Sequence, residues 1–194
     1  MPQHLRTRNI RALVVNPGDE GTTWVDPSSS DLMLSDITEE VLIADIASML
    51  DVTHLAPASA DDMVWPVRAL LYGIFSRAMV SLVVSAARAK AAAGKAARNV
   101  NVIFLVDTGS PYTFISQSTF VALGYNDSLP RTASLCVHGV NMTVQPSHSH
   151  FKDVNVLGTD FLVRARCSLM LDFATAEGLL DKAGEAKRYR TPEL

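Results

Sequence analysis

The feature that most constrains this sequence is an acid that directly follows a run of apolar residues. The letters FLVDTGSPYTFIS occupy positions 104–116, and four apolar residues, Ile103 to Val106, precede Asp107. A carboxylate at the end of a buried strand is unfavourable unless it is hydrogen-bonded, paired or used in chemistry. The chain is therefore expected to bury a strand up to residue 106 and to place Asp107 where its charge has a partner or a task.

Composition favours a folded domain and excludes several classes of function. Hydrophobic residues make up 48% of the 194 residues, charged residues make up 19%, and the formal net charge is −3. The hydrophobic share is sufficient for a core, and a weakly negative chain exerts no long-range attraction on nucleic acid. Cys136 and Cys167 form no CxxC pair, so neither a disulfide framework nor a zinc site is indicated, and a small buried thiol is expected at each. No phosphate loop or dinucleotide fingerprint occurs, and we expect no cofactor.

The sequence contains no clear targeting or membrane segment. Charged residues interrupt the first 21 positions, which is not typical of a secretory signal. The most apolar segment, 67–89, has the length of a membrane helix, but Arg68 and Arg77 interrupt it. We therefore expect no membrane span and an intracellular, cytoplasmic protein.

Residues 1–62 are interpreted as a small α+β unit of unknown role. Its expected elements are strands at 10–16 and 22–26 and an amphipathic helix at 35–50. We expect Asp36 to cap this helix, with Glu39 three residues later completing a capping box. The Ala-, Pro- and Ser-containing segment 56–62 is typical of a linker.

The rest of the chain is interpreted as a mostly β domain between a connection and a tail. Residues 63–98 are expected to form an apolar and Ala/Lys-rich connection that includes a first strand at 79–84, residues 99–180 the β domain, and residues 181–194 a charged tail. Within the β domain we expect a strand at 102–106, a helix at 116–124 capped by Ser116 and ended by Gly124, a hairpin at 134–144 that turns at His138 and Gly139, a strand at 154–158, a helical turn at 159–166 and a strand at 167–173.

Two motifs of the β domain stand at a fixed spacing. An apolar run leads into Asp-Thr-Gly-Ser, and fifty-one positions after Asp107 (158 − 107) the letters NVLG open a helix that precedes a last strand. This combination resembles the retropepsin-like aspartic proteases. The resemblance covers roughly residues 78–180. It implies half of a retropepsin-like closed β-barrel or sandwich with one or two short helices, preceded by the small α+β unit, and an aspartic endopeptidase of a retroelement-like kind.

The resemblance also implies roles for six residues. Asp107 would be the catalytic acid, Thr108 would hydrogen-bond across a dimer axis, Gly109 would let the loop approach the reacting centre, Ser110 would hold the outer oxygen of the carboxylate, and Leu157 and Gly158 would pack behind the active loop. Amide hydrolysis needs both a base and an acid, and two neighbouring carboxyls that share one proton supply both. Because Asp-Thr-Gly occurs once, we expect the second carboxyl to come from a second copy in a two-fold homodimer that acts on a polypeptide substrate.

One departure from the family pattern leaves a second hypothesis open. Family members close a glycine-rich flap hairpin over the substrate, whereas the interval 125–133 is short and contains no glycine. The alternative is therefore a flap-poor, weakly active or inactive module that serves in interaction or dimerisation. If the chain is a protease, we expect either weak proteolysis of extended or unfolded chains or a cover from residues 1–77, with 63–75 as the best candidate.

The other polar residues give weaker signals. The histidines of 148–150, with His138 and Asp153, could bind a metal only if their loops converge, and a solvated loop without metal is the preferred interpretation. Asp160 is expected to cap a helix or pair with an arginine, and Asp172 is expected on the exposed face of its strand.

Overall fold

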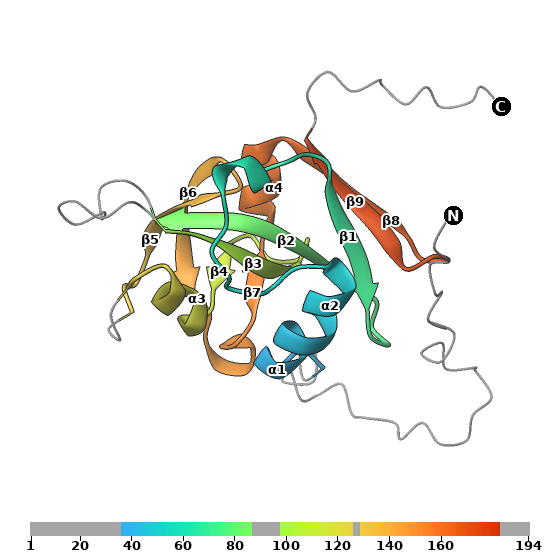
Figure 1. Ribbon diagram of the computed structural model, residues 1–194, viewed down its shortest axis with the longest axis horizontal. Coiled ribbons are helices and arrows are strands. Elements are labelled where there is room, and N and C mark those ends of the chain that lie inside the picture. Colours follow the sequence, from blue (N-terminus) through green and yellow to red (C-terminus); the bar gives the residue numbers. More distant parts are fainter. Residues whose placement is uncertain (1–35, 87–97, 126–128, 183–194) are drawn as a thin grey trace, which may run out of the picture.

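The computed structural model describes residues 36–86, 98–125 and 129–182 (Figure 1). The predicted strands at 10–16 and 22–26 and most of the Ala/Lys-rich stretch lie outside this part of the chain. The strands are β1 (Val67–Tyr72), β2 (Arg77–Ala86), β3 (Asn99–Val106), β4 (Phe114–Ile115), β5 (Ala133–Val137), β6 (Val140–Pro146), β7 (Asn155–Leu157), β8 (Cys167–Asp172) and β9 (Glu177–Lys182). The helical segments are α1 (Glu39–Val41), η3 (Leu42–Ile46), α2 (Ala47–Leu50), η4 (Ala60–Asp62), α3 (Gln117–Ala122), η6 (Ser149–Phe151) and α4 (Thr159–Ala165).

Six of the strands close into a β-barrel. They follow the order β3-β7-β4-β6-β5-β2, and β2 pairs back with β3 in antiparallel register, with Met79 opposite Leu105. The other edge of β2 is shared, because its first residues pair with β1 and its last three pair with β5. Strands β1, β9 and β8 continue from that edge as an arm of the sheet (Figure 1). The expectation of a mostly β, barrel-like fold with short helices is thus confirmed.

The apolar segment 67–89 supplies two strands instead of a long helix. Residues 67–72 and 77–86 form β1 and β2, and within the described residues no helix is long and apolar enough to cross a membrane. The segment is continuously hydrophobic because β2, like its neighbour β3, is covered on both faces of the sheet. Side chains on one face fill the barrel, and those on the other face pack under the helix at 39–50. A strand buried on both faces loses the alternation of polar and apolar residues.

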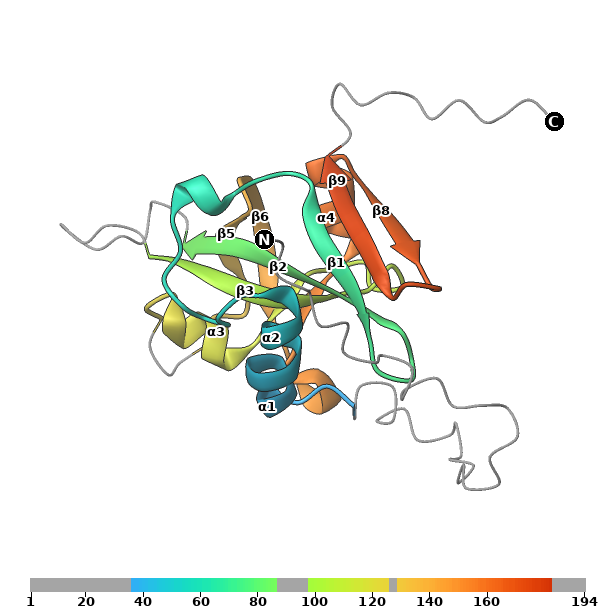
Figure 2. The ribbon, with the colours of Figure 1, turned by 45° about the vertical axis from the view of Figure 1, so that its right-hand side comes forward.

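The segments α1, η3 and α2 form one helix that lies along the outside of the sheet (Figure 2). Its buried Leu42 and Ile46 are 0% exposed and share a cluster with apolar residues of β1, β2, β3 and β7. Burial of each such side chain contributes about 1.5–3 kcal/mol. The described part of the predicted N-terminal unit therefore packs into the same core as the strands.

Polar contacts fix the direction of this helix. Asp36 pairs with Arg77 of β2 at 3.4 Å, and Asp45 accepts a hydrogen bond from the hydroxyl of Tyr72 at 3.2 Å. The helix therefore runs antiparallel to β1. The predicted Asp36 cap is wrong, because the ion pair takes this carboxylate and Thr38 caps the helix by accepting from Val41 N at 3.3 Å.

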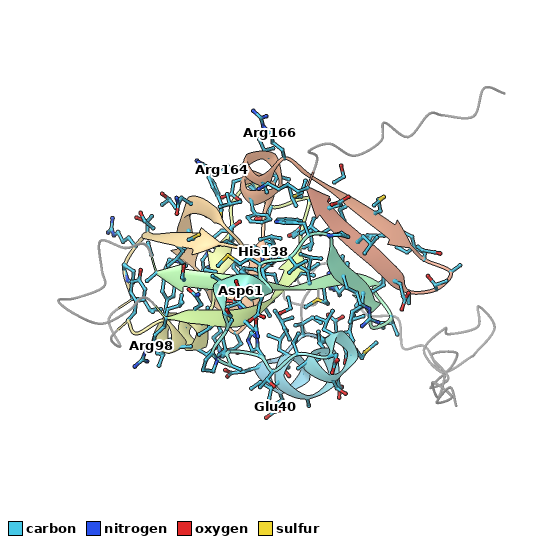
Figure 3. All side chains as sticks on the ribbon, turned by 45° about the horizontal axis from the view of Figure 1, so that its top comes forward. Glu40, Asp61, Arg98, His138, Arg164 and Arg166 are labelled. Atoms are coloured by element: carbon cyan, nitrogen blue, oxygen red, sulfur yellow. The ribbon has the colours of Figure 1, made fainter. Side chains whose placement is uncertain are left out.

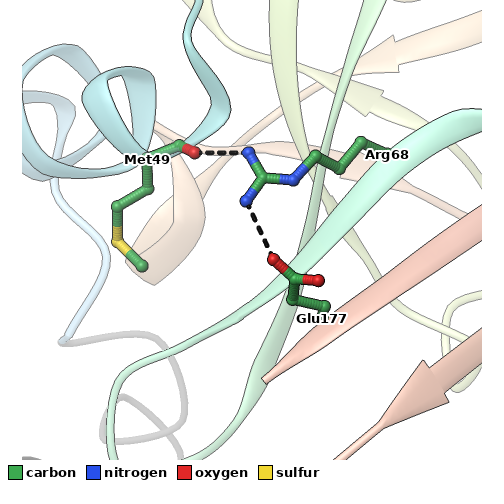
Figure 4. Close-up of polar contacts among 3 residues, drawn as sticks. All are labelled: Met49, Arg68 and Glu177. Atoms are coloured by element: carbon green, nitrogen blue, oxygen red, sulfur yellow. Dashed lines mark hydrogen bonds and ion pairs between the residues drawn. The ribbon is translucent and has the colours of Figure 1, made fainter. Parts of the chain in front are cut away.

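Arg68 joins the end of the helix to the arm of the sheet (Figure 4). Its Nη1 donates to Met49 O at 2.7 Å, and its Nη2 lies 3.3 Å from Glu177 Oε1. The Arg68 and Glu177 side chains are 52% and 62% exposed, so this ion pair contributes at most about 1 kcal/mol. The apolar face of the helix therefore stabilises its docking far more than the ion pair does.

The segment predicted as a linker continues the sheet. Leu55 N donates to Asn101 O at 2.7 Å, and Asn101 N donates to Ala56 O at 3.0 Å, so residues 55–58 satisfy the free edge of β3. The first two residues of the predicted tail, Asp181 and Lys182, likewise end strand β9. Neither pairing could be predicted from the sequence, because edge pairing depends on a distant strand and has no local signal.

Buried His54 belongs to the same edge. It is 8% exposed, its Nδ1 accepts from Ile103 N at 3.1 Å, and its Nε2 has no partner among the described residues. Desolvation lowers the pKa of this imidazole from 6.5 to about 4. Because the unfolded chain binds the proton near pH 6.5 and the folded chain only near pH 4, folding stability falls as the pH drops through this window.

We expect His54→Asn to weaken this pH dependence. Asparagine keeps an acceptor near the position of Nδ1 and does not titrate, so the variant should lose up to about 3 kcal/mol less stability than the wild type between pH 7 and pH 4. Urea unfolding at several pH values measures the difference, with the exposed His148→Asn as the matched control. Parallel pH profiles for the wild type and His54→Asn would contradict this role of His54.

Candidate functional site

The barrel fixes the position at which Asp107 leaves the sheet. Val106 is 7% exposed and ends β3, and the backbone N–H of Asp107 donates to Leu157 O at 3.1 Å. This bond extends the parallel pairing of β3 with β7, in which Val106 lies opposite Leu157. The main chain of Asp107 is therefore held by two strands.

The residues after Asp107 form a tight turn around its carboxylate. Gly109 N donates to Asp107 Oδ1 at 2.8 Å, and Ser110 N donates to Asp107 O at 3.2 Å. Asp107 is half-buried, whereas Thr108 and Gly109 are exposed. The Ser110 hydroxyl does not hold the outer carboxylate oxygen as expected, because it donates to Tyr112 O at 2.7 Å. The role expected for Thr108 needs a second chain and stays a prediction.

Leu157 and Gly158 lie directly behind this turn. Leu157 is 0% exposed, and a Cβ added to Gly158 would lie 2.3 Å from Tyr112 O and 3.0 Å from Ser110 O. The backbone of Gly158 has a φ of −84°, which any residue can adopt. Glycine is therefore required at this position by the close approach of two backbone segments.

The sequence did not reveal Thr113 as a site residue, and it left two roles open for Asp160, a helix cap or a partner of an arginine. The Thr113 hydroxyl donates to Asp160 Oδ1 at 2.7 Å, and Thr113 N donates to Oδ2 at 3.2 Å. Asp160 also accepts from Phe161 N at 2.8 Å, and the contacts recorded for it in the described chain include no arginine. The only sequence signal was the position of Asp160 in the first turn of α4, which does not reveal a partner 47 residues away.

The β5–β6 hairpin does not cover Asp107. Its turn residues His138 and Gly139 have φ of 45° and 84°, as a two-residue type I′ turn requires. His138 N donates to Val83 O at 2.6 Å, and Val83 lies opposite Asn101. Asn101 precedes Asp107 by six residues (107 − 101), so the turn lies roughly 20 Å away along the strand.

The ring of His138 fixes the hairpin at that end. Its Nδ1 accepts from Val83 N at 3.3 Å, its Nε2 lies 3.1 Å from Val64 O, and Trp65 meets it edge-on at 5.0 Å between ring centroids. Figure 3 shows His138 among interior side chains, whereas Arg164 on α4 points outward. Burial lowers the pKa of His138, which keeps the ring neutral and able to accept the Val83 bond.

The β1–β2 turn lies at the Asp107 end of the sheet. Met79, near the start of β2, lies opposite Leu105, which precedes Asp107 by two residues. The turn itself exposes Ile74 and Phe75, which are 60% and 54% exposed. The turn between β8 and β9 lies at the same end (Figure 2). Apolar side chains are thus available near the acid without the β5–β6 hairpin.

The histidines do not gather into a cluster in the described part of the chain. His148 packs against Phe114 and Phe151, whereas His138 contacts Trp65. Among the described residues no group of three or more His, Cys, Asp or Glu side chains is placed to hold a metal ion. Cys136 and Cys167 are free thiols. Both are partly exposed, whereas buried thiols were expected.

Comparison with known proteins assigns no family to the chain. No protein-family model, curated protein or solved structure matches it significantly. The retropepsin-like resemblance therefore rests on the residues of the sequence, and function has to be inferred from the geometry of the Asp107 turn.

We expect Gly158→Ala to disrupt the site and lower stability. The added methyl group would meet the backbone at Tyr112, which cannot move without shifting the active loop, and overpacking of this kind costs about 1–3 kcal/mol or more. The matched control is Gly109→Ala, whose Cβ would lie 3.2 Å from the Asp107 carboxylate. Thermal unfolding should rank Gly158→Ala well below Gly109→Ala, and equal melting temperatures would refute the close approach.

Proposed function

We propose that this protein is an aspartic endopeptidase that hydrolyses peptide bonds as a homodimer. The observation that carries the proposal is a carboxylate, Asp107, at the end of a doubly buried strand, in a turn that leaves Thr108 and Gly109 exposed. The one hydrogen bond recorded to the Asp107 side chain within the described residues comes from Gly109, so the second oxygen is available for chemistry.

The chemistry needs a second carboxyl group close to the first. Two carboxyls about 3 Å apart cannot both be ionised, so they share one proton. The ionised member activates a water molecule for attack on the amide carbon, and the protonated member donates to the carbonyl oxygen. An isologous dimer with its axis beside Thr108 and Gly109 would bring the two Asp107 side chains together.

Exposed groups on the same protomer support a homodimer. Tyr112 in the active loop is 54% exposed, and Phe173 after β8 is 70% exposed. Strand β8 is the last strand of the sheet order, so one of its edges has no partner strand in the described chain. Unpaired strand edges and apolar side chains are features that a second copy can cover.

The substrate class follows from the position of the hairpin. A site without a flap can accept an extended polypeptide but loses part of the positioning that a closed cover provides. The exposed Ile74 and Phe75 lie in the β1–β2 turn, within the segment 63–75, and we propose that they contact the bound chain. Removal of residues 1–62 cannot test this, because it would strip the helix from a buried core.

The alternative is a module that dimerises through the same loop and cleaves little or nothing. The observation that favours it is the attachment of the β5–β6 hairpin to Val83, since this hairpin cannot close over a bound chain while His138 holds it. The two functions share the fold and the dimer. They differ in whether Asp107 is needed for hydrolysis.

We expect Asp107→Asn to abolish peptide cleavage and to leave a folded dimer. The amide keeps the shape of the carboxyl group but can neither take nor give the shared proton. Cleavage of a peptide library by wild type and variant, followed by mass spectrometry between pH 4 and pH 7, measures the effect, and wild-type activity should be greatest at mildly acidic pH. Asp153→Asn, which removes an exposed carboxylate elsewhere, is the control. Equal cleavage by wild type and Asp107→Asn would refute the catalytic role, and no cleavage by the wild type would favour the alternative.

We also expect the specific activity to fall on dilution. Each protomer supplies one carboxyl group, so activity should follow the fraction of dimer as the concentration passes the dimer dissociation constant. Activity per milligram and sedimentation velocity over the same concentrations test this together. An active monomer, or constant specific activity while the dimer dissociates, would exclude a shared dyad.

A further inference from the structure

We propose that Asp160 and Thr113 form a clamp that positions the active loop for catalysis. The clamp deepens the proposed function and rests on it. Asp160 is not offered as a catalytic residue, because it acts through the backbone of the loop that carries Asp107. Its contribution is to hold the loop where two copies of Asp107 can share a proton.

The clamp acts at the far end of the loop, where Thr113 O also accepts from Gln145 N of β6 at 3.2 Å. The near end is fixed by the bond from Asp107 N to Leu157 O. Between the two ends, Thr108, Gly109, Pro111 and Tyr112 are all exposed. Thr113, which is 0% exposed, is the first buried residue after them, and both its N–H and its hydroxyl donate to the carboxylate of Asp160.

The same helix start reaches the loop at further points. Gly158 N donates to the hydroxyl oxygen of Thr113 at 3.1 Å. Thr159 donates to Ser110 O twice, from its backbone N at 2.9 Å and from its hydroxyl at 3.1 Å. The Gly158–Asp160 segment thus binds the loop at Ser110 and at Thr113, on either side of Tyr112.

A carboxylate is the group that this arrangement requires at position 160. Three donors converge on its two oxygens, namely Thr113 N, the Thr113 hydroxyl and Phe161 N. An amide has one acceptor oxygen, so Asp160→Asn would direct an NH2 group against at least one N–H or O–H donor. The hydrogen bonds to the charged group are also stronger than those to a neutral one. The amide variant is therefore expected to loosen the loop although it preserves the shape of the side chain.

Loose positioning is expected to slow the chemical step more than substrate binding. The carboxyls of a dyad have to meet within hydrogen-bond distance, and a displacement of about 1 Å can lower a rate about 100-fold. Substrate contacts made by residues outside the loop are unaffected. The clamp therefore predicts a loss in kcat with little change in KM.

The experiment compares four variants in the full chain. Asp160→Asn and Thr113→Val break the clamp, and Thr113→Ser keeps the hydroxyl group and should restore it. Asp62→Asn is the matched control, because Asp62 also accepts a backbone N–H bond, from Ser59 at 2.7 Å, but next to Ala58, which pairs with Asn99 at the far end of β3. Each protein is assayed for kcat and KM on a peptide that the wild type cleaves, and for amide hydrogen exchange over residues 107–115.

The clamp predicts one pattern across both measurements. In Asp160→Asn and Thr113→Val, kcat should fall at least about tenfold with KM within about threefold of the wild type, and the backbone amides within 108–113 should exchange faster than in the wild type, whereas those of β3 should not change. Thr113→Ser and Asp62→Asn should resemble the wild type in both. Should Asp160→Asn fail to fold, the comparison of Thr113→Val with Thr113→Ser decides.

Two results would overturn the clamp. Unchanged exchange at 108–113 in the variants that break it would show that the loop does not depend on these bonds. Faster exchange with an unchanged kcat would show that the bonds are structural only. Failure of the proposed function is distinguishable from both results, because it would appear as no hydrolysis by the wild type. That result would also refute the catalytic role of the clamp. The exchange data would still show whether the clamp holds the loop.

Discussion

The burial of β2 and β3 on both faces is the constraint on which the rest of this structure depends. One face fills the barrel with residues such as Val80 and Phe104, and the other face packs Met79 and Ile103 under the helix at 39–50. At about 1.5–3 kcal/mol for each buried side chain, these contacts outweigh every surface ion pair between the same elements. The helix and the barrel therefore stabilise each other, and neither face of the central strands can be exposed without loss of the fold.

This rigid centre explains where a reactive group can be placed. Residues of β3 from Val102 to Val106 are buried, whereas Thr108 and Gly109 are exposed and the loop that holds them is bonded at Ser110 to Thr159 at the start of α4. A site needs residues held to within a fraction of an ångström, and it also needs access to solvent and substrate. The junction of a buried strand with a loop fixed from behind meets both conditions, which is the physical reason to assign the chemistry to Asp107.

The sequence predicted best those features that local interactions determine. Ser116 caps α3 by accepting from Thr119 N, and the hairpin turns at His138 and Gly139, as expected. The Asp36 cap, the linker and the end of β9 failed because partners far away in the chain decide them. The same division holds in the site, since Asp107 and its turn form a local motif, whereas the contact of Thr113 with Asp160 spans 47 residues and has no local pattern.

The closure of the barrel also explains why the β5–β6 hairpin does not serve as a flap. Strand β5 pairs with Val84 and the residues after it on β2, and this pairing is one of the joints that close the ring of six strands. A hairpin that closes the barrel cannot also open and shut over a substrate, because each opening would break the joint and expose buried Leu135 and Val137. The short interval before the hairpin leaves no chain for a second one. Among the described residues, the exposed turn after β1 is therefore the candidate that could cover a bound peptide, and a second protomer is the other source of a cover.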